Sequence, residues 1–189
     1  MTSQASPLAP QRLVQSRDDG GGVKAGGSLP PPSRVASFLA AGTELVCALG
    51  AGDRLVARSH ECDYPEWVKT LPAVSRPTFP ITESSAEIDA LVRERIGSGQ
   101  PLYEVDHSLL DELSPDLLVT QTHCDVCAVA PADIARGAKC SHATVSMAGG
   151  TVEDVLRGFS RVAGALGLES AGEVSWESFG RALQAFERG

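Results

Sequence analysis

Two apolar stretches of the sequence each end in side chains that can ligate a metal or hold a polar ligand. The residues after the first stretch, 55–59, are His60, Glu61, Cys62, Asp63 and Tyr64. The second stretch, 117–121, ends in Thr120 and Gln121 and is followed by His123, Cys124, Asp125 and Cys127. Imidazole nitrogens and thiolate sulfurs ligate zinc and other transition metals, and a carboxylate either orients a nearby histidine or caps a turn.

The Cys124-x-x-Cys127 pair permits three interpretations. It forms half of a zinc site, a redox pair, or two small cysteines that pack against a sheet. With Cys62 and either His60 or His123, a tetrahedral zinc site becomes possible. The redox interpretation is the weaker chemical one, because thioredoxin-type pairs lie at a helix N-terminus. Here a proline at 131 indicates that the next helix begins only after the pair.

The remaining candidate side chains have simpler interpretations. Tyr64 and Trp67 could stack on a flat ligand or form an aromatic lid over the sheet edge. The residues that we expect to be structural or solvated are Cys47, His107, Cys140 and His142.

The elements that must position these residues alternate between strand and helix patterns. The expected strands are 34–39, 53–59, 73–75, 116–121 and 143–147, and the expected helices are 43–50, 84–97, 107–113, 131–136 and 151–167. The strands are apolar throughout instead of alternating, which is typical of a parallel sheet covered on both faces. The sequence therefore predicts an α/β fold with a Rossmann-like parallel sheet and helices on both faces.

This topology predicts where the chemistry lies. In open α/β sheets the ligand crevice lies beyond the carboxyl ends of the strands. The loops that directly follow the expected strands are 40–43, 59–64, 120–127 and 147–150. We therefore expect the residues of the 60s loop and of the 120s loop to gather at one edge.

Bulk composition narrows the class of protein. A chain of 189 residues with 42% hydrophobic and 21% charged residues is typical of one globular domain. The net charge of −8 argues against a nucleic-acid partner, and no apolar stretch approaches the roughly 20 residues of a transmembrane helix. The first 33 residues resemble a disordered tail without a signal peptide, which predicts a cytoplasmic location and reduced thiols. Arginine and serine without acids in residues 1–17 leave organellar targeting as an alternative.

Several stretches in order resemble a known family. The segment "RVASFLAAGTELVCALGAGDRLVARSHECDYP", and further on "SSAEID", "LYEVD", "SPDLLVTQ" and "CDVCAV", resemble the cobalamin-binding branch of the cobalamin and iron–siderophore substrate-binding proteins of ABC transporters. The resemblance runs from Arg34 to Gly167. It implies a class III periplasmic-binding-protein fold, in which two Rossmann-like lobes joined by one long helix hold the ligand between them. Ala40 and Ala41 replace the proline and serine that the family usually has after its first strand.

The resemblance covers one lobe only. We expect a ligand-binding lobe at 34–168 and the start of the interlobe helix at 169–189. An apolar stripe in that last segment would need a partner chain, a second lobe or the first lobe to cover it. Its members are Trp176, Phe179, Leu183 and Phe186.

The expected function is non-enzymatic binding of a small metal chelate such as cobalamin. The loop residues named above would carry that function, and a histidine could ligate cobalt axially. The alternative is a structural or regulatory zinc protein that uses Cys62, Cys124, Cys127 and one histidine. An enzyme with a reactive thiol is disfavoured, because no base and orienting group can be assigned beside a particular cysteine.

Overall fold

The computed structural model describes residues 30–82, 84–122, 129, 133–134 and 142–170. Its strands are β1 (Val35–Ser37), β2 (Leu55–Arg58), β3 (Ser75–Pro77), β4 (Tyr103–Val105), β5 (Leu117–Gln121) and β6 (Ala143–Met147). Its α-helices are α1 (Ala40–Ala48), α2 (Ser85–Gly97), α3 (His107–Leu113) and α5 (Val152–Ala165), with 3-10 helices η1 (Gly52–Arg54) and η2 (Glu66–Thr70). None of these helices is both long and apolar enough to cross a membrane.

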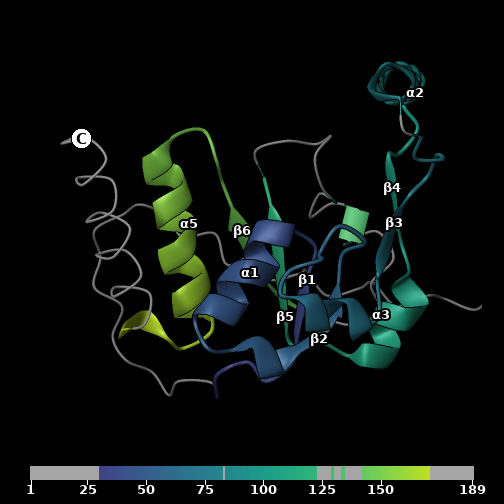
Figure 1. The fold of residues 1–189 in the computed structure, drawn as a ribbon. Coiled ribbons are helices and arrows are strands. Elements are labelled where there is room, and N and C mark those ends of the chain that lie inside the picture. The colour runs from purple at the N-terminus through teal and green to yellow at the C-terminus, as the bar shows by residue number, and fades with distance from the viewer. Residues whose placement is uncertain (1–29, 83, 123–128, 130–132, 135–141, 171–189) are drawn as a thin grey trace, which may run out of the picture.

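Four of the strands form one parallel sheet in the order β2-β1-β5-β6. All five residues of β5 are buried, as expected for an inner strand covered on both faces. The predicted parallel sheet is therefore confirmed, and Figure 1 shows its strands between the flanking helices.

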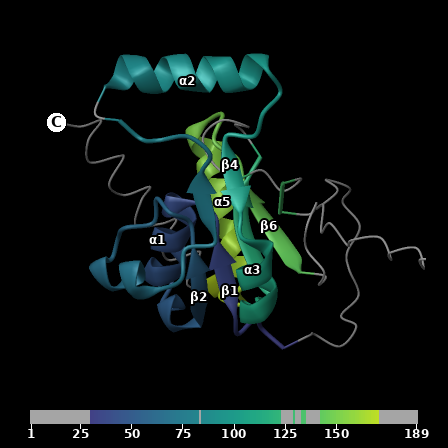
Figure 2. The same ribbon diagram turned by 90° about the vertical axis from the view of Figure 1, so that its right-hand side faces the viewer.

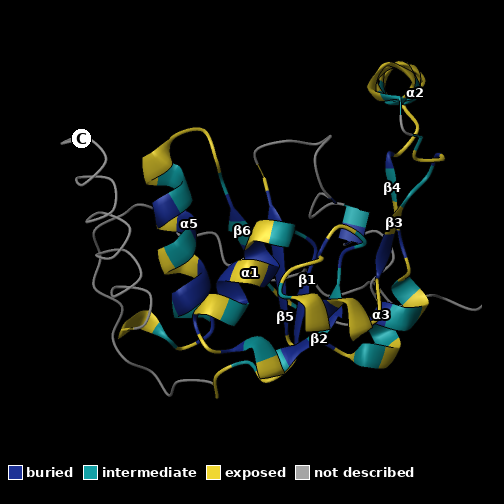
Figure 3. Ribbon diagram, viewed as in Figure 1, coloured by how far each residue is buried: buried dark blue, intermediate teal, exposed yellow. Residues whose placement is uncertain are grey.

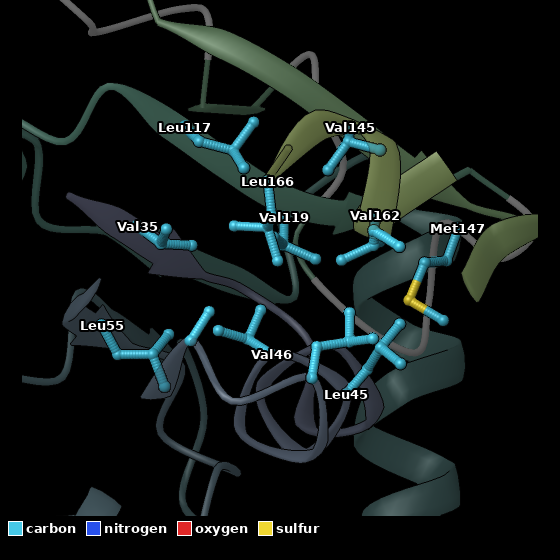
Figure 4. Packing of buried hydrophobic residues seen from close by; sticks show 13 residues of the cluster. Val35, Leu45, Val46, Leu55, Leu117, Val119, Val145, Met147, Val162 and Leu166 are labelled. Atoms are coloured by element: carbon cyan, nitrogen blue, oxygen red, sulfur yellow. The ribbon is translucent and has the colours of Figure 1, made fainter. Parts of the chain in front are cut away.

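Helices cover both faces of this sheet, as predicted. On one face α1 and α5 pack against alternate strand residues such as Val35, Leu117 and Val119, and Figure 4 shows this cluster. On the other face, Ala36 and Leu118 pack with Leu110 of α3. Figure 3 shows buried residues concentrated where the sheet and helices meet. Two separate apolar clusters therefore hold the sheet in place.

Local capping fixes the ends of two predicted helices. Thr151 caps α5, since its hydroxyl accepts from the Asp154 N–H at 3.1 Å and the Asp154 carboxylate accepts from the Thr151 N–H at 3.0 Å. Ser84 caps α2 through the Glu87 N–H at 3.3 Å. Val152, the first residue of α5, is 57% exposed, and the buried residues of the helix begin one turn later, at Leu156.

A separate ribbon replaces one expected strand of the sheet. The expected strand 73–75 contributes only a single bridge between Ala73 and Arg58. Ser75–Pro77 instead pairs antiparallel with Tyr103–Val105, a strand that the sequence pattern did not predict. The prediction of a third sheet strand was wrong because these strands are three residues long and their partner is distant in sequence.

The ribbon carries helix α2 away from the sheet, as Figure 2 shows. None of the thirteen residues of α2 is buried. Arg95 fastens the helix to the ribbon through the carbonyl of Thr78 at 2.9 Å. Three expected segments, the tail at 1–33, the helix at 131–136 and the linking helix at 169–189, lie wholly or mostly outside the described residues.

Candidate ligand site at the carboxyl edge of the sheet

The loops after the parallel strands begin at one edge of the sheet. Strands β2 and β5 both pair with β1 in parallel, so their carboxyl ends lie two strand spacings apart, which is about 10 Å. Beyond the sheet, the Thr122 N–H donates to the Met147 carbonyl at 3.1 Å. The topology therefore supports the predicted common edge as far as Thr122, the last described residue before the 120s loop.

His60 is the predicted metal ligand that the structure describes in most detail at this edge. Its Nδ1 lies 3.2 Å from the Ser75 hydroxyl and 3.4 Å from the Ser59 hydroxyl, and the two hydroxyls are 3.3 Å apart. The imidazole ring packs against Tyr103 with 5.5 Å between ring centroids. Its other nitrogen, Nε2, lies 3.8 Å from a Glu61 carboxylate oxygen. The ring is thus held in place through one nitrogen and one face.

The surroundings of His60 favour its neutral form. Partial burial lowers the pKa of this imidazole, and Glu61 opposes that effect by attracting the proton. A neutral imidazole keeps a lone pair on one nitrogen, which is the form that ligates metals. When Nδ1–H donates to Ser75, the lone pair is on Nε2. This arrangement matches metal-bound histidines, in which the second nitrogen bonds to a fixed partner.

Cys62 faces the opposite way from His60. Its side chain is 1% exposed, and its Sγ accepts a hydrogen bond from the Thr43 hydroxyl of α1 at 3.0 Å. Burial raises the pKa of this thiol despite the hydrogen bond from Thr43. Cys62 and His60 therefore contact different elements, and the structure does not bring them together as a ligand pair.

The other residues of the 60s loop are open to solvent. Glu61 and Asp63 are exposed, and Tyr64 is 66% exposed. Trp67 of η2 is 44% exposed and lies near the same loop in sequence. These side chains offer carboxylates and aromatic surface on the outside of the loop.

Thr120 and Gln121 do not present their side chains at the surface. Thr120 is fully buried and its hydroxyl donates to the Val129 carbonyl at 2.8 Å, while Gln121 is 2% exposed. Both are expected ligand-binding residues that the fold places inside β5. The geometry assigns them to supporting the edge.

The proposed zinc ligands are only partly within the described structure. His123, Cys124, Asp125 and Cys127 lie outside the described residues. Among the residues that the structure describes, no group of three His, Cys, Asp or Glu side chains could hold a metal ion. The described part of the site therefore gives zinc no three-ligand cluster.

Sequence reasoning missed the residues that hold His60. These are Ser75 and Tyr103, which come from the antiparallel ribbon. Ser59 alone had a signal, since it directly precedes His60. The ribbon partners could not be identified without knowing how β3 and β4 pair.

The structure is similar to several solved binding proteins, although no family model and no curated protein matches the sequence. The periplasmic vitamin B12 binding protein BtuF of Vibrio cholerae has a TM-score of 0.59 and 19% identity, over 82% of this chain and 49% of that one. The periplasmic heme-binding protein RhuT from Roseiflexus sp. RS-1 has a TM-score of 0.57 and 20% identity, over 81% and 48%. The heme-binding protein BhuT, in complex with two hemes, has a TM-score of 0.53 and 27% identity, over 80% and 48%.

These likenesses confirm the predicted fold and its partial extent. The chain has the fold of the class III periplasmic substrate-binding proteins and spans about half the length of these solved structures. The matching proteins are periplasmic binding proteins, which agrees with the expectation of a non-enzymatic protein.

The expected cytoplasmic location is contradicted. It depended on the composition of the first 33 residues, whereas the proteins that share the fold are periplasmic. The absence of an apolar leader in those residues was therefore the wrong basis for assigning a compartment.

Proposed function

We propose that this chain, which has the fold of one lobe of a class III substrate-binding protein, binds a metal-centred tetrapyrrole in the periplasm, with cobalamin as the ligand. The observation that carries the proposal is the fixed, neutral His60 at the carboxyl edge of the sheet. The fold supports it, since solved proteins with this fold include binders of vitamin B12 and heme.

His60 would act as the axial ligand to the metal. The contact between its Nδ1 and the Ser75 hydroxyl orients the ring, and in the tautomer with the proton on Nδ1 the lone pair of Nε2 faces the metal. Tyr103 packs against the ring and limits its rotation. A metal-ligating side chain that is already held in one orientation loses less conformational entropy when the metal binds.

The surface next to His60 suits a large flat molecule. Tyr64, in the same loop, exposes an aromatic ring that could pack against a macrocycle face. Glu61 and Asp63 add carboxylates that can accept hydrogen bonds from amide side groups. Amide donors surround a corrin ring, whereas the heme edge carries carboxylates that these two acids would repel. This charge difference favours cobalamin over heme.

One lobe supplies only one wall of the site. Pockets bury roughly 70–90% of a ligand's surface, and an open sheet edge buries less. The chain also spans about half the length of the solved relatives in fold. We therefore assign residues 34–168 to the ligand-binding lobe and infer that a second lobe, on the same or another chain, closes the site.

The test is titration of the protein with hydroxocobalamin while the corrin absorption bands are recorded. Replacement of the labile cobalt ligand by His60 should shift these bands in a saturable way. The variant His60→Asn places an amide where Nδ1 was, which keeps a partner for Ser75 but removes the imidazole donor. We expect this variant to lose the band shift.

The matched control is His142→Asn. His142 directly precedes β6, at the opposite edge of the sheet, and its Nδ1 lies 2.6 Å from the Pro115 carbonyl. This variant should keep the full band shift. An unchanged shift in His60→Asn, or no shift with the unmodified protein, would rule out axial ligation by His60.

A further inference from the structure

Two cysteines, one in the 60s loop and one in α1, are not used by the proposed ligand site. Cys62 is buried in the turn after β2, and Cys47 is half-buried near the end of α1. From the sequence, Cys47 was expected to be structural and Cys62 to be a metal ligand. Their positions relative to α1 indicate a different chemistry.

Thr43 places the Cys62 sulfur against the side of α1 that also carries Cys47. The Thr43 hydroxyl lies 3.0 Å from the Cys62 Sγ. Thr43 and Cys47 are four residues apart in α1, so their side chains are neighbours on one face, with about 5–6 Å between Cβ atoms. The Cys62 sulfur therefore contacts the face of α1 that carries Cys47, about one helical turn before it.

The neighbours of Cys47 include the segment that follows the 60s loop. A methyl group placed on Gly52 would lie 3.3 Å from the Cys47 Sγ and 3.1 Å from the Trp67 ring. Cys47 thus borders η2, the helix that follows the 60s loop. In addition, burial and then the charge of a Cys62 thiolate raise the pKa of the Cys47 thiol.

We propose that Cys47 and Cys62 form a reversible disulfide that fastens the 60s loop to α1. The structure holds both in the reduced form. Bond formation needs rotation of the two side chains about χ1, since a disulfide joins sulfurs at about 2.05 Å. Disulfides persist in the periplasm, the compartment of the proteins that share this fold.

A small disulfide such as oxidised glutathione would serve as the oxidant. The Cys47 thiolate, which is the more accessible, attacks one glutathione sulfur, and the other glutathione leaves as a thiolate. The Cys62 thiolate then attacks the Cys47 sulfur of the mixed disulfide and releases the second glutathione. The two protein sulfurs are oxidised, the oxidant is reduced, and the two thiol protons end on the two glutathione molecules.

The disulfide would change the loop that carries His60. In the described part of the chain, one hydrogen bond joins Cys62 of the 60s loop to α1, and Thr43 donates it. A covalent bond at the same place would restrict movement of His60, two residues away. Oxidation would thereby stabilise the folded protein.

The experiment is incubation of the reduced protein with oxidised glutathione at about pH 8.5, near the ordinary thiol pKa, because burial raises the pKa of both thiols. After acid quenching, free thiols are alkylated and peptides are identified by mass spectrometry. We expect a peptide pair joined between Cys47 and Cys62 that disappears on reduction. Melting temperature should rise by several degrees on oxidation.

The variants Cys47→Ser and Cys62→Ser serve as controls. Each should abolish the joined peptide pair and the rise in melting temperature. Stable glutathionylation of Cys47 without closure to Cys62 would overturn the proposal, as would a bond from Cys62 to Cys124, Cys127 or Cys140. Full alkylation of both thiols after exposure to the oxidant would overturn it as well.

Discussion

At the scale of single residues, neighbouring side chains of one short loop have opposite environments. His60 faces the antiparallel ribbon and Cys62 faces α1, although only one residue separates them. The first is fixed yet partly open, and the second is buried. Side-chain direction within the loop therefore decides which of the two can meet a ligand.

The lowered pKa of His60 predicts how stability depends on pH. In the unfolded chain the imidazole titrates near its ordinary value of about 6.5, and in the folded protein it titrates lower because burial disfavours its charged form. The unfolded state therefore binds the proton first as pH falls. This contribution is neutral above about pH 6.5, becomes destabilising as the pH falls below that value, and levels off below the folded pKa.

We expect urea unfolding at several pH values to show this effect as a difference between two proteins. The free energy of unfolding of the unmodified protein should fall more steeply below about pH 6.5 than that of His60→Asn, which cannot titrate there. Parallel pH profiles for the two proteins would show that burial of His60 does not disfavour its protonated form.

Gly42 of α1 predicts a steric effect at one residue. A Cβ on Gly42 would lie 2.7 Å from Cγ1 of Val119, a stiff side chain of β5. Gly42→Ala should therefore destabilise the protein by about 1–3 kcal/mol in denaturant unfolding. The control is Gly158→Ala in α5, where the added Cβ meets Met147 at an ordinary 3.6 Å. That variant should be neutral or more stable by up to about 1 kcal/mol. Equal effects of the two changes would contradict the close packing of α1 on β5.

The residue scale also shows what a sequence can reveal about a site. His60 was identifiable because a reactive side chain directly follows an apolar strand, which is a local pattern. Ser75 and Tyr103 were not identifiable, because their contact with His60 depends on pairing between two distant three-residue strands. The local sequence pattern thus predicts which residues lie at the edge of the sheet. Pairing between distant strands determines which side chains contact those residues.

At the scale of elements, two well-capped helices differ in how far they are buried against the rest of the protein. Helix α5 lies on the sheet with four buried residues, whereas α2 stands on the ribbon with none (Figure 1). Both were predictable from sequence, because capping residues and helical spacing are local. Their different contributions to the core were not, because burial depends on where the ribbon carries α2.

Because the two helices differ in burial, we expect loss of the N-terminal cap to lower the free energy of unfolding more for α5 than for α2. Thr151→Ala removes the cap of α5 and should lower the free energy of unfolding by about 1 kcal/mol. Ser84→Ala removes the corresponding cap of α2. It should change global stability by less than about 0.5 kcal/mol, because α2 can fray without exposing core residues. Chemical denaturation followed by fluorescence measures both, and a larger loss in Ser84→Ala would show that α2 is part of the cooperative core.

At the scale of the whole molecule, the order of the sheet brings the loops together. The turn after β2 and the turn after β5 begin at the same edge because both strands run parallel to β1. The chain spans about half the length of solved proteins of the same fold. Alternating strand and helix patterns predicted this architecture, whereas the compartment expected from the first residues was contradicted by proteins that share the fold.

The most direct test of the central claim locates the bound ligand on the protein. Amide hydrogen exchange, measured with and without hydroxocobalamin, reports which backbone segments become protected. We predict protection at 39–42, 59–64 and 121–122, which are at the carboxyl edge, with little change at 33–34, 115–116 and 142, which are at the opposite edge. Protection confined to the opposite edge, or to α2, would contradict the proposed binding surface.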